Sequence, residues 1–301
     1  MYHRILPADD TRTQYEEPGM VVTPETFALH LRILREYFNI IHLTEWIEKK
    51  QKGEVLPAKS CAVTFDDGWR DNFEYAFPVL WKTQTPATIF LVADMIGSTD
   101  TFWPQRLTRL IQHVNKHPEQ RSHPVFDWLP DKLTTSSLSS EQISVLINKV
   151  KQYSDVEIHQ YIDNCNKTLG IDDAGTDADL LDWQQVTAMQ ASGLVDIGSH
   201  TCQHTRLTSQ LSSEQLEHEI VDSKAIIEQH IGKPVNLFCY PNGDLCDLAV
   251  QKVAQHYDGA VTTQSGWNNA SSDVHQLKRM GVHEDIASDK TAFLARISGW
   301  L

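Results

Sequence analysis

The chain has 301 residues, of which 41% are hydrophobic and 22% charged, a balance typical of a globular protein. Its net charge of −14 argues against a nucleic-acid partner and against electrostatic attraction to anionic lipid. No apolar run is long enough for a transmembrane helix, and no signal peptide is visible, which favours the cytoplasm. The five cysteines form no CxxC pair, so we expect reduced thiols.

Short apolar runs alternate along the chain with longer helical patterns. The strand-like runs are Met1–Ile5, Ile40–Leu43, Cys61–Phe65, Ala87–Val92, Val195–Ser199, Val235–Tyr240, Gly259–Thr262 and Gln276–Val282. The helical stretches between them are Thr23–Tyr37, Thr44–Lys52, Asp71–Thr83, Trp183–Ser192, Ser212–Ile231 and Asp247–His256. This alternation, with seven or eight strands, predicts an α/β fold with a parallel barrel, complete or irregular.

One region breaks the alternation. From about residue 101 to 179 no convincing strand is visible, and Leu107–Lys116, Ser140–Tyr153 and Val156–Leu169 have helical patterns. We expect a mostly helical insertion in one loop of a single domain that spans 1–301. The insertion is either a lid or edge of a substrate cleft, or it has no functional role.

Two adjacent carboxylates, Asp66 and Asp67, follow the run Cys61–Phe65 in the sequence TFDDG. Active sites of α/β proteins lie at the carboxyl ends of parallel strands. One aspartate could bind a metal ion while the other remains free as a base. The alternative is a turn and helix-cap cluster, since Asp and Gly suit both.

A second motif, His200 and His204 in SHTCQH, follows the run Val195–Ser199 and can present two imidazoles to one metal. His113 and His117 have the same spacing but follow no strand, so we interpret them as a solvated helix end. A third motif, FCYPNG at 238–243, could hold a backbone N–H toward the site or be an ordinary turn.

These motifs combine into one chemistry. One Asp and two His leave coordination positions open for water and substrate, which is usual for a hydrolytic metal site, and the second Asp supplies a base. TFDDG, SHTxxH and FxYPxG, in this order, resemble the carbohydrate esterase family 4 polysaccharide deacetylases, or NodB-homology domain. The resemblance covers the chain to about Val282, apart from the insertion.

The resemblance implies a distorted (β/α) barrel of seven or eight strands and metal-dependent removal of N-acetyl, sometimes O-acetyl, groups from sugars. It implies Asp67, His200 and His204 as metal ligands and Asp66 as the base. It also implies that the backbone N–H of Tyr240 stabilises the oxyanion and that Pro241 shapes that loop, with the neighbouring Asn242 expected to contact substrate. The ion implied is Zn²⁺, with Co²⁺ or Ni²⁺ as alternatives.

Two positions depart from the family pattern. Cys239 stands where many members have an arginine that orients the base, and Arg279 is the candidate substitute. No Leu-x-His motif follows the Tyr-Pro motif. The N-terminal Tyr-His pair instead resembles the opening of permuted exopolysaccharide-type members, which implies His3 as the general acid, with His283 as the weaker candidate.

The expected partner is a carbohydrate, and no protein partner is indicated. Trp69 is predicted to stack on sugar, and three further tryptophans could border the groove: Trp103, Trp183 and Trp267. For Trp183 the core is the favoured interpretation, since a tryptophan at a helix start usually packs there. Three functional alternatives remain: removal of another acyl group such as formyl, a catalytically silent carbohydrate-binding barrel, and a scaffolding protein with a fortuitous site.

Overall fold

The computed structural model describes residues 1–133, 137–171 and 179–299. At its centre is a five-stranded parallel sheet in the order β5-β6-β7-β8-β9, and two further sheets are the parallel pairs β1-β2 and β3-β4. The strands are β1 (Arg4–Ile5), β2 (Val21–Val22), β3 (Asn39–Ile40), β4 (Ser60–Cys61), β5 (Val63–Phe65), β6 (Ala87–Leu91), β7 (Val195–Ser199), β8 (Leu237–Cys239) and β9 (Gly259–Val261). Most were predicted at these places, with bounds that differ by a few residues.

The central sheet continues beyond its regular strands at both edges. Tyr2 forms a parallel bridge with Phe65 of β5, and Leu277 forms one with Val261 of β9. The run predicted as a strand at 276–282 is therefore present only as a single bridge. Its backbone nevertheless occupies the place of an edge strand.

The two edges meet through the first residue of the chain. The amide of Val282 donates to the carbonyl of Met1 at 3.1 Å, and the N-terminal ammonium donates to the carbonyl of Met280 at 2.9 Å. The sheet therefore curls into a parallel half-barrel that irregular backbone closes, and the predicted distorted α/β barrel is confirmed.

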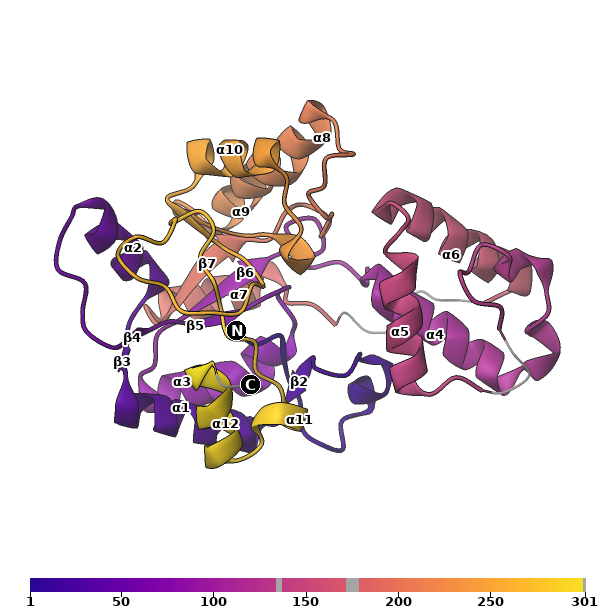
Figure 1. The fold of residues 1–301 in the computed structure, drawn as a ribbon, viewed down its shortest axis with the longest axis horizontal. Helices are drawn as coiled ribbons and strands as arrows, with labels where there is room; N and C mark the ends of the chain where they lie inside the picture. Colours follow the sequence, from indigo (N-terminus) through magenta and orange to yellow (C-terminus); the bar gives the residue numbers. More distant parts are fainter. Residues whose placement is uncertain (134–136, 172–178, 300–301) are drawn as a thin grey trace.

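Helices pack around this half-barrel (Figure 1). They are α1 (Pro24–Tyr37), α2 (Leu43–Gln51), α3 (Phe77–Thr83), α7 (Trp183–Ala191), α8 (Ser213–Glu217), α9 (Ser223–Ile231), α10 (Asp247–His256), α11 (Glu284–Ala287) and α12 (Lys290–Ser298). In Figure 1, α8, α9 and α10 lie on the opposite side of the sheet from α1, α11 and α12. The main hydrophobic core lies between the sheet and these helices.

Local sequence signals account for several helix ends. Thr23 caps α1 by accepting a hydrogen bond from the amide of Thr26, and Pro24 occupies the first turn, as predicted. Gly232 ends α9 at φ 66°, a left-handed conformation that glycine adopts without steric cost. None of the described helices is long and apolar enough to cross a membrane.

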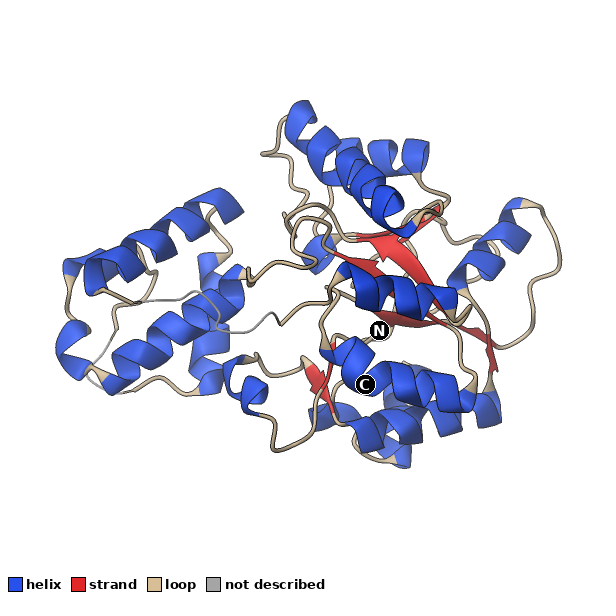
Figure 2. Ribbon diagram, turned by 180° about the vertical axis from the view of Figure 1, so that it is seen from behind, coloured by secondary structure: helices blue, strands red, loops and turns tan. Residues whose placement is uncertain are grey.

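The main helices of the insertion are α4 (Trp103–Lys116), α5 (Ser140–Val150) and α6 (Asp155–Leu169), and the described part of the insertion contains no strand (Figure 2). It lies to one side of the half-barrel and has a hydrophobic core of its own. Ser139 and Gln142 form the capping box of α5, close to the start expected from the sequence.

Both ends of the insertion attach to the same short segment after β5. The backbone of Trp69 pairs with that of Leu180 in an antiparallel bridge, and the amide of Leu181 donates to the carbonyl of Gly68 at 2.9 Å. At the other end, the ring of Phe102 lies 5.1 Å from that of Trp69. The insertion therefore emerges directly beside the TFDDG motif.

Candidate active site

The three sequence motifs converge at the carboxyl end of the parallel sheet. Asp66 and Asp67 follow β5, while His200 and His204 follow β7. In parallel strands these ends lie at one edge, which explains why residues more than 130 positions apart meet. Arg279 reaches the same place from the closing segment 277–282.

The predicted metal ligands face one another. Oδ1 of Asp67 lies 3.4 Å from Nε2 of His200 and 3.4 Å from Nε2 of His204. Two ligand atoms bound tetrahedrally at about 2.0–2.1 Å from zinc are separated by roughly 3.4 Å. The donor atoms and their spacing therefore fit a zinc ion.

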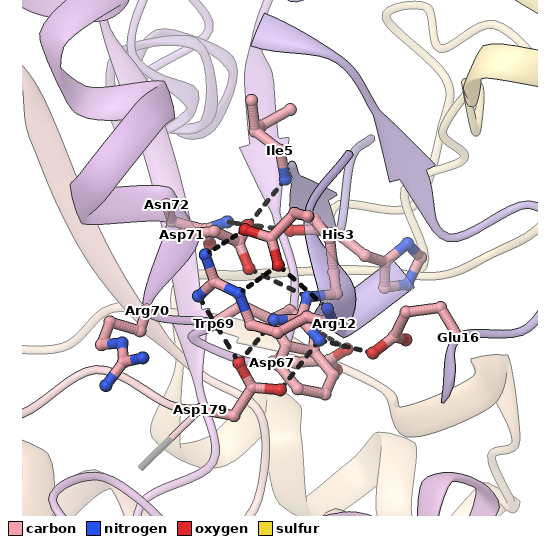
Figure 3. Close-up of polar contacts among 12 residues, drawn as sticks. His3, Ile5, Arg12, Glu16, Asp67, Trp69, Arg70, Asp71, Asn72 and Asp179 are labelled. Carbon is pink, nitrogen blue, oxygen red and sulfur yellow. Dashed lines mark hydrogen bonds and ion pairs between the residues drawn. The ribbon is translucent and has the colours of Figure 1, made fainter. Parts of the chain in front are cut away.

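Neighbouring groups hold each ligand in orientation. Nδ1 of His200 pairs with the carbonyl of Cys239 at 2.8 Å, which leaves Nε2 for a cation. The indole Nε1 of Trp69 donates to Oδ2 of Asp67 at 2.8 Å (Figure 3). The other oxygen, Oδ1, is left facing the imidazoles of His200 and His204. The Phe102 ring packs 4.9 Å from that of His204. Burial would raise the pKa of Asp67, but hydrogen bonds from the two histidines hold it well below its usual value.

Asp66 is buried in an ion pair with Arg279. The guanidinium donates to Oδ1 and Oδ2 of Asp66 at 2.6 and 2.7 Å. Burial alone would raise the pKa of this carboxyl, but the attraction of Arg279 and its hydrogen bonds lower it to about 2. Arg279 thus stands beside the carboxylate as expected, and it keeps Asp66 ionised at neutral pH.

Cys239 completes the surroundings of Asp66. The Arg279 guanidinium also donates to its sulfur at 3.2 Å, and burial raises the pKa of the thiol well above its usual value. Asp66, His200 and Cys239 form a second group of donor atoms within 4.8 Å of one another. This group fits a cation less well, because the negative charge of Asp66 is already balanced by Arg279 and the Cys239 sulfur remains a protonated thiol.

His3 lies across from Asp66, with Nε2 4.0 Å from its Oδ2. The carbonyl of His3 accepts a hydrogen bond from Nδ2 of Asn72 at 2.9 Å, which fixes the backbone at this point. Burial lowers the pKa of His3 below its usual 6.5. His283, the weaker candidate, instead contacts Oδ2 of Asp285 at 3.2 Å.

The structure disagrees with the assignment of the Tyr240 amide as an oxyanion donor. This N–H donates to the carbonyl of Val261 at 3.2 Å as part of the sheet, so it is already used. The backbone N–H of Asn242, two residues further on, has no hydrogen-bond partner within residues 1–133, 137–171 and 179–299. Asn242 holds the left-handed φ of 58° in the turn that begins at buried Pro241.

The predicted sugar-stacking residues lie elsewhere than expected. Trp69 is only 1% exposed, so its face is unavailable to a sugar, and its indole N–H instead donates to Asp67. Trp103 is buried in the insertion core, and Trp183 stacks on His230 at 4.0 Å. Trp267 is exposed, with its ring 6.1 Å from that of Phe38 after α1.

The insertion reaches the rim of the site at two places. Nζ of Lys151 donates to Oδ1 of Asn242 at 3.0 Å. Arg206, two residues after His204, donates to Oδ1 of Asp155 at 2.8 Å and to the carbonyl of Lys151 at 2.8 Å. The corner between α5 and α6 is therefore bonded to the loop that carries His204, a contact that sequence patterns gave no signal for.

Comparisons with known proteins agree with this geometry. A family model described as polysaccharide deacetylase matches residues 53–258. Over 107 residues the chain is 38% identical to the poly-beta-1,6-N-acetyl-D-glucosamine N-deacetylase of Staphylococcus epidermidis, covering 33% of this chain and 37% of that protein. Over 119 residues it is 38% identical to the putative polysaccharide deacetylase YxkH of Bacillus subtilis, covering 38% of each. The match spans less than two fifths of either relative.

Solved structures share the fold over almost the whole chain. The deacetylase PplD of Streptococcus pyogenes, in complex with acetate, superposes with a TM-score of 0.64 at 18% identity, covering 99% of this chain and 96% of that one. IcaB from Ammonifex degensii has a TM-score of 0.61 at 20% identity, covering 98% and 94%. The half-barrel, the converging motifs and a family match over more than half of the sequence lead to one conclusion: the chain belongs to the polysaccharide deacetylase family.

Proposed function

We propose that the protein removes N-acetyl groups from amino sugars of a poly- or oligosaccharide by metal-dependent hydrolysis. The observation that carries this proposal is the set of Asp67, His200 and His204 at ligand spacing, directly beside an ionised Asp66. The name of the Staphylococcus epidermidis relative supports N-acetylglucosamine as the sugar.

A divalent cation on Asp67, His200 and His204 would acidify water and polarise the acyl carbonyl. Zinc suits these ligands best, with cobalt and nickel as substitutes. Asp66, which Arg279 keeps ionised, accepts the proton of the attacking water. Asp66 passes this proton to His3, whose Nε2 lies 4.0 Å from Oδ2 of Asp66, and His3 donates it to the leaving amine. Acetate and a free amino sugar result.

The oxyanion that develops on the acyl group needs a hydrogen-bond donor. The backbone N–H of Tyr240 is already bonded within the sheet, so we assign this role to the backbone N–H of Asn242. The left-handed turn at Asn242 and its side-chain bonds to Lys151 and Asp244 hold this peptide in place. Part of the insertion therefore contributes to the shape of the acyl-binding side.

The test combines metal content with acetate release. The protein is incubated with N-acetylglucosamine oligomers, with and without a chelator, beside Asp66→Asn, His200→Ala and the control His117→Ala. His117 belongs to the other HxxxH pair, and its ring stacks on that of His113 on the insertion. We expect release that the chelator abolishes, that both site variants lose and that the control retains.

Other outcomes point to the remaining functions. Bound zinc without acetate release would mean that another acyl group, such as formyl, or another sugar is the substrate. A protein that takes up no zinc on titration would contradict the proposal and favour a carbohydrate-binding barrel.

A further inference from the structure

Beneath the candidate site lies a fully buried arginine, Arg4, which the mechanism does not use. Its Nε donates to Oδ2 of Asp71 at 2.9 Å. Its two terminal nitrogens donate to the two oxygens of Asp179 at 2.9 and 2.6 Å, and one of them also pairs with Glu16. Three carboxylates from three separate segments therefore surround the edge of one guanidinium.

The flat face of the same guanidinium lies against Trp69. The central carbon of Arg4 is 4.1 Å from the centre of the indole ring. A buried cation over an indole face is a favourable contact, and it fixes the plane of the ring. Trp69 is also packed by Phe102, and its backbone is bridged to that of Leu180.

The N–H edge of the Trp69 indole contacts Asp67, one of the three candidate metal ligands. Trp69 Nε1 donates to Oδ2 of Asp67, and the second oxygen of Asp67 is the one that faces both histidines. Figure 3 shows Trp69 and Asp67 together with the surrounding acids Glu16, Asp71 and Asp179. A fixed indole therefore determines which carboxylate oxygen remains for a cation.

We propose that Arg4 is a positioning residue that acts through Trp69 to fix the Asp67 carboxylate for metal binding. The role depends on the shape of the guanidinium as well as its charge, because only a planar fork can satisfy three carboxylates and an aromatic face together. Lysine at this position keeps the positive charge but lacks the planar surface that packs on the Trp69 ring. The inference rests on the proposed function, since it requires that the chain bind a metal ion.

The test measures the zinc dissociation constant of the metal-free protein by competition with a chromophoric chelator. The variants are Arg4→Lys, Trp69→Phe and the double variant, and thermal unfolding checks that each is folded. Trp69→Phe keeps an aromatic face for Arg4 and removes only the Nε1 donor. The matched control is Arg70→Lys, because the side chain of Arg70, next to Trp69 in the chain, pairs with Glu74 at 3.1 Å, a carboxylate that does not bond to Arg4.

We expect each single variant to bind zinc roughly tenfold to hundredfold more weakly than the wild type, as is usual for groups that orient a metal ligand. The double variant should bind zinc no more weakly than the weaker-binding single variant, because both substitutions interrupt the same series of contacts from Arg4 through Trp69 to Asp67. The control should match the wild type. If Arg4→Lys does not fold, Asp179→Asn, which loosens the guanidinium without emptying the core, should show the same loss.

Three results would overturn the inference, and they are distinguishable. A wild type that binds zinc, with unchanged affinity in Arg4→Lys or in a folded Asp179→Asn, contradicts the positioning role alone. If the loss of zinc affinity in the double variant equals the product of the two single losses, Arg4 does not act through Trp69. A wild type that binds no zinc contradicts the proposed function and removes the inference with it.

Discussion

Four residues at the site hold their backbone in the left-handed region: Asp67 at φ 75°, Thr201 at 70°, His204 at 61° and Asn242 at 58°. They are four of the six described non-glycine residues with positive φ. Such conformations cost roughly 1–3 kcal/mol each and persist only where the surroundings impose them. Two are metal-ligand candidates and one is the assigned oxyanion donor, so the strain lies where side-chain or amide direction matters most.

At this scale the general acid is testable through the leaving group. His3→Asn should lower turnover of an N-acetyl amino sugar by about 10²–10⁴-fold, because the departing amine needs a proton. An activated aryl acetate, whose leaving group needs none, should lose far less. Steady-state rates on the two substrates check this. His283→Asn is the control, and a selective loss of amide turnover there would reverse the assignment.

Arg279 offers a prediction on pH. In the wild type Asp66 has a pKa of about 2, so the base is ionised at every practical pH. In Arg279→Met the group that most opposes the effect of burial is gone, so the pKa of Asp66 rises. Because only the ionised form accepts a proton, activity of the variant should fall as pH decreases toward the raised pKa, while the wild type shows no such loss from Asp66. The measurement is kcat/KM against pH, and superimposable acid limbs would refute this account.

At the scale of elements, the closure of the half-barrel depends on helices packed against the N-terminal segment. His30 of α1 is fully buried, with Nδ1 3.2 Å from the hydroxyl of Tyr2 and Nε2 2.6 Å from the carbonyl of Ala287. Its ring stacks on Phe293 of α12 at 3.9 Å. One imidazole thus joins the first residues, α1 and the C-terminal helices.

This packing predicts a stability that depends on pH. Burial lowers the pKa of His30 below its usual 6.5, so below that pH the unfolded chain takes up a proton that the folded chain does not. Stability should therefore fall as pH decreases from 6.5, by up to about 1.4 kcal/mol per pH unit from this group. Urea midpoints of wild type and His30→Gln between pH 8 and 5 measure the difference. Parallel curves for the two proteins would contradict it.

At the scale of the whole molecule, Arg206 joins the insertion to the metal-site loop. Its side chain and that of Asp155 are 10% and 12% exposed, so the pair is largely shielded from solvent. Hydrogen bonds to charged groups contribute about 1.5–3 kcal/mol each. Their loss should let the corner between α5 and α6 open more often.

Arg206→Met should therefore speed amide hydrogen exchange around 150–155 by roughly tenfold to hundredfold. Peptides from β6 and β7 should exchange as in the wild type. Lys149→Met is the control, since Lys149 forms an ion pair with Asp131 that is exposed at the surface. Unchanged exchange in the Arg206 variant would show that the insertion is held by other contacts.

Much of this architecture was predictable because parallel strands place their carboxyl ends together. Asp66, Asp67, His200 and His204 were recognisable from the runs that precede them. The orientation of Trp69 was not, because a tryptophan after a strand-end turn fits a sugar groove and a buried hydrogen bond equally well. The Tyr240 assignment failed since a sequence does not reveal which neighbouring carbonyl an amide meets.

The shortest elements were also beyond prediction from pattern. The two-residue strand β2 (Val21–Val22), which pairs with β1, is too short to show a period and directly precedes the cap of α1. The closing segment at 277–282 has a strand-like sequence but forms a single bridge. Beyond that bridge, the carbonyl of Met280 and the amide of Val282 bond to Met1, a partner that only the folded chain brings near.

The attachment of both insertion ends beside Trp69 has a consequence for how such enzymes diversify. Because Phe102 and Leu180 both contact Trp69, the segment between them can lengthen, shorten or be exchanged by recombination without distorting the sheet. Such an exchange would alter what borders the rim near Asn242 and leave Asp66, Asp67 and the histidines in place. The saccharides that a lineage accepts can then evolve separately from its bond-breaking chemistry, through replacement of one contiguous module.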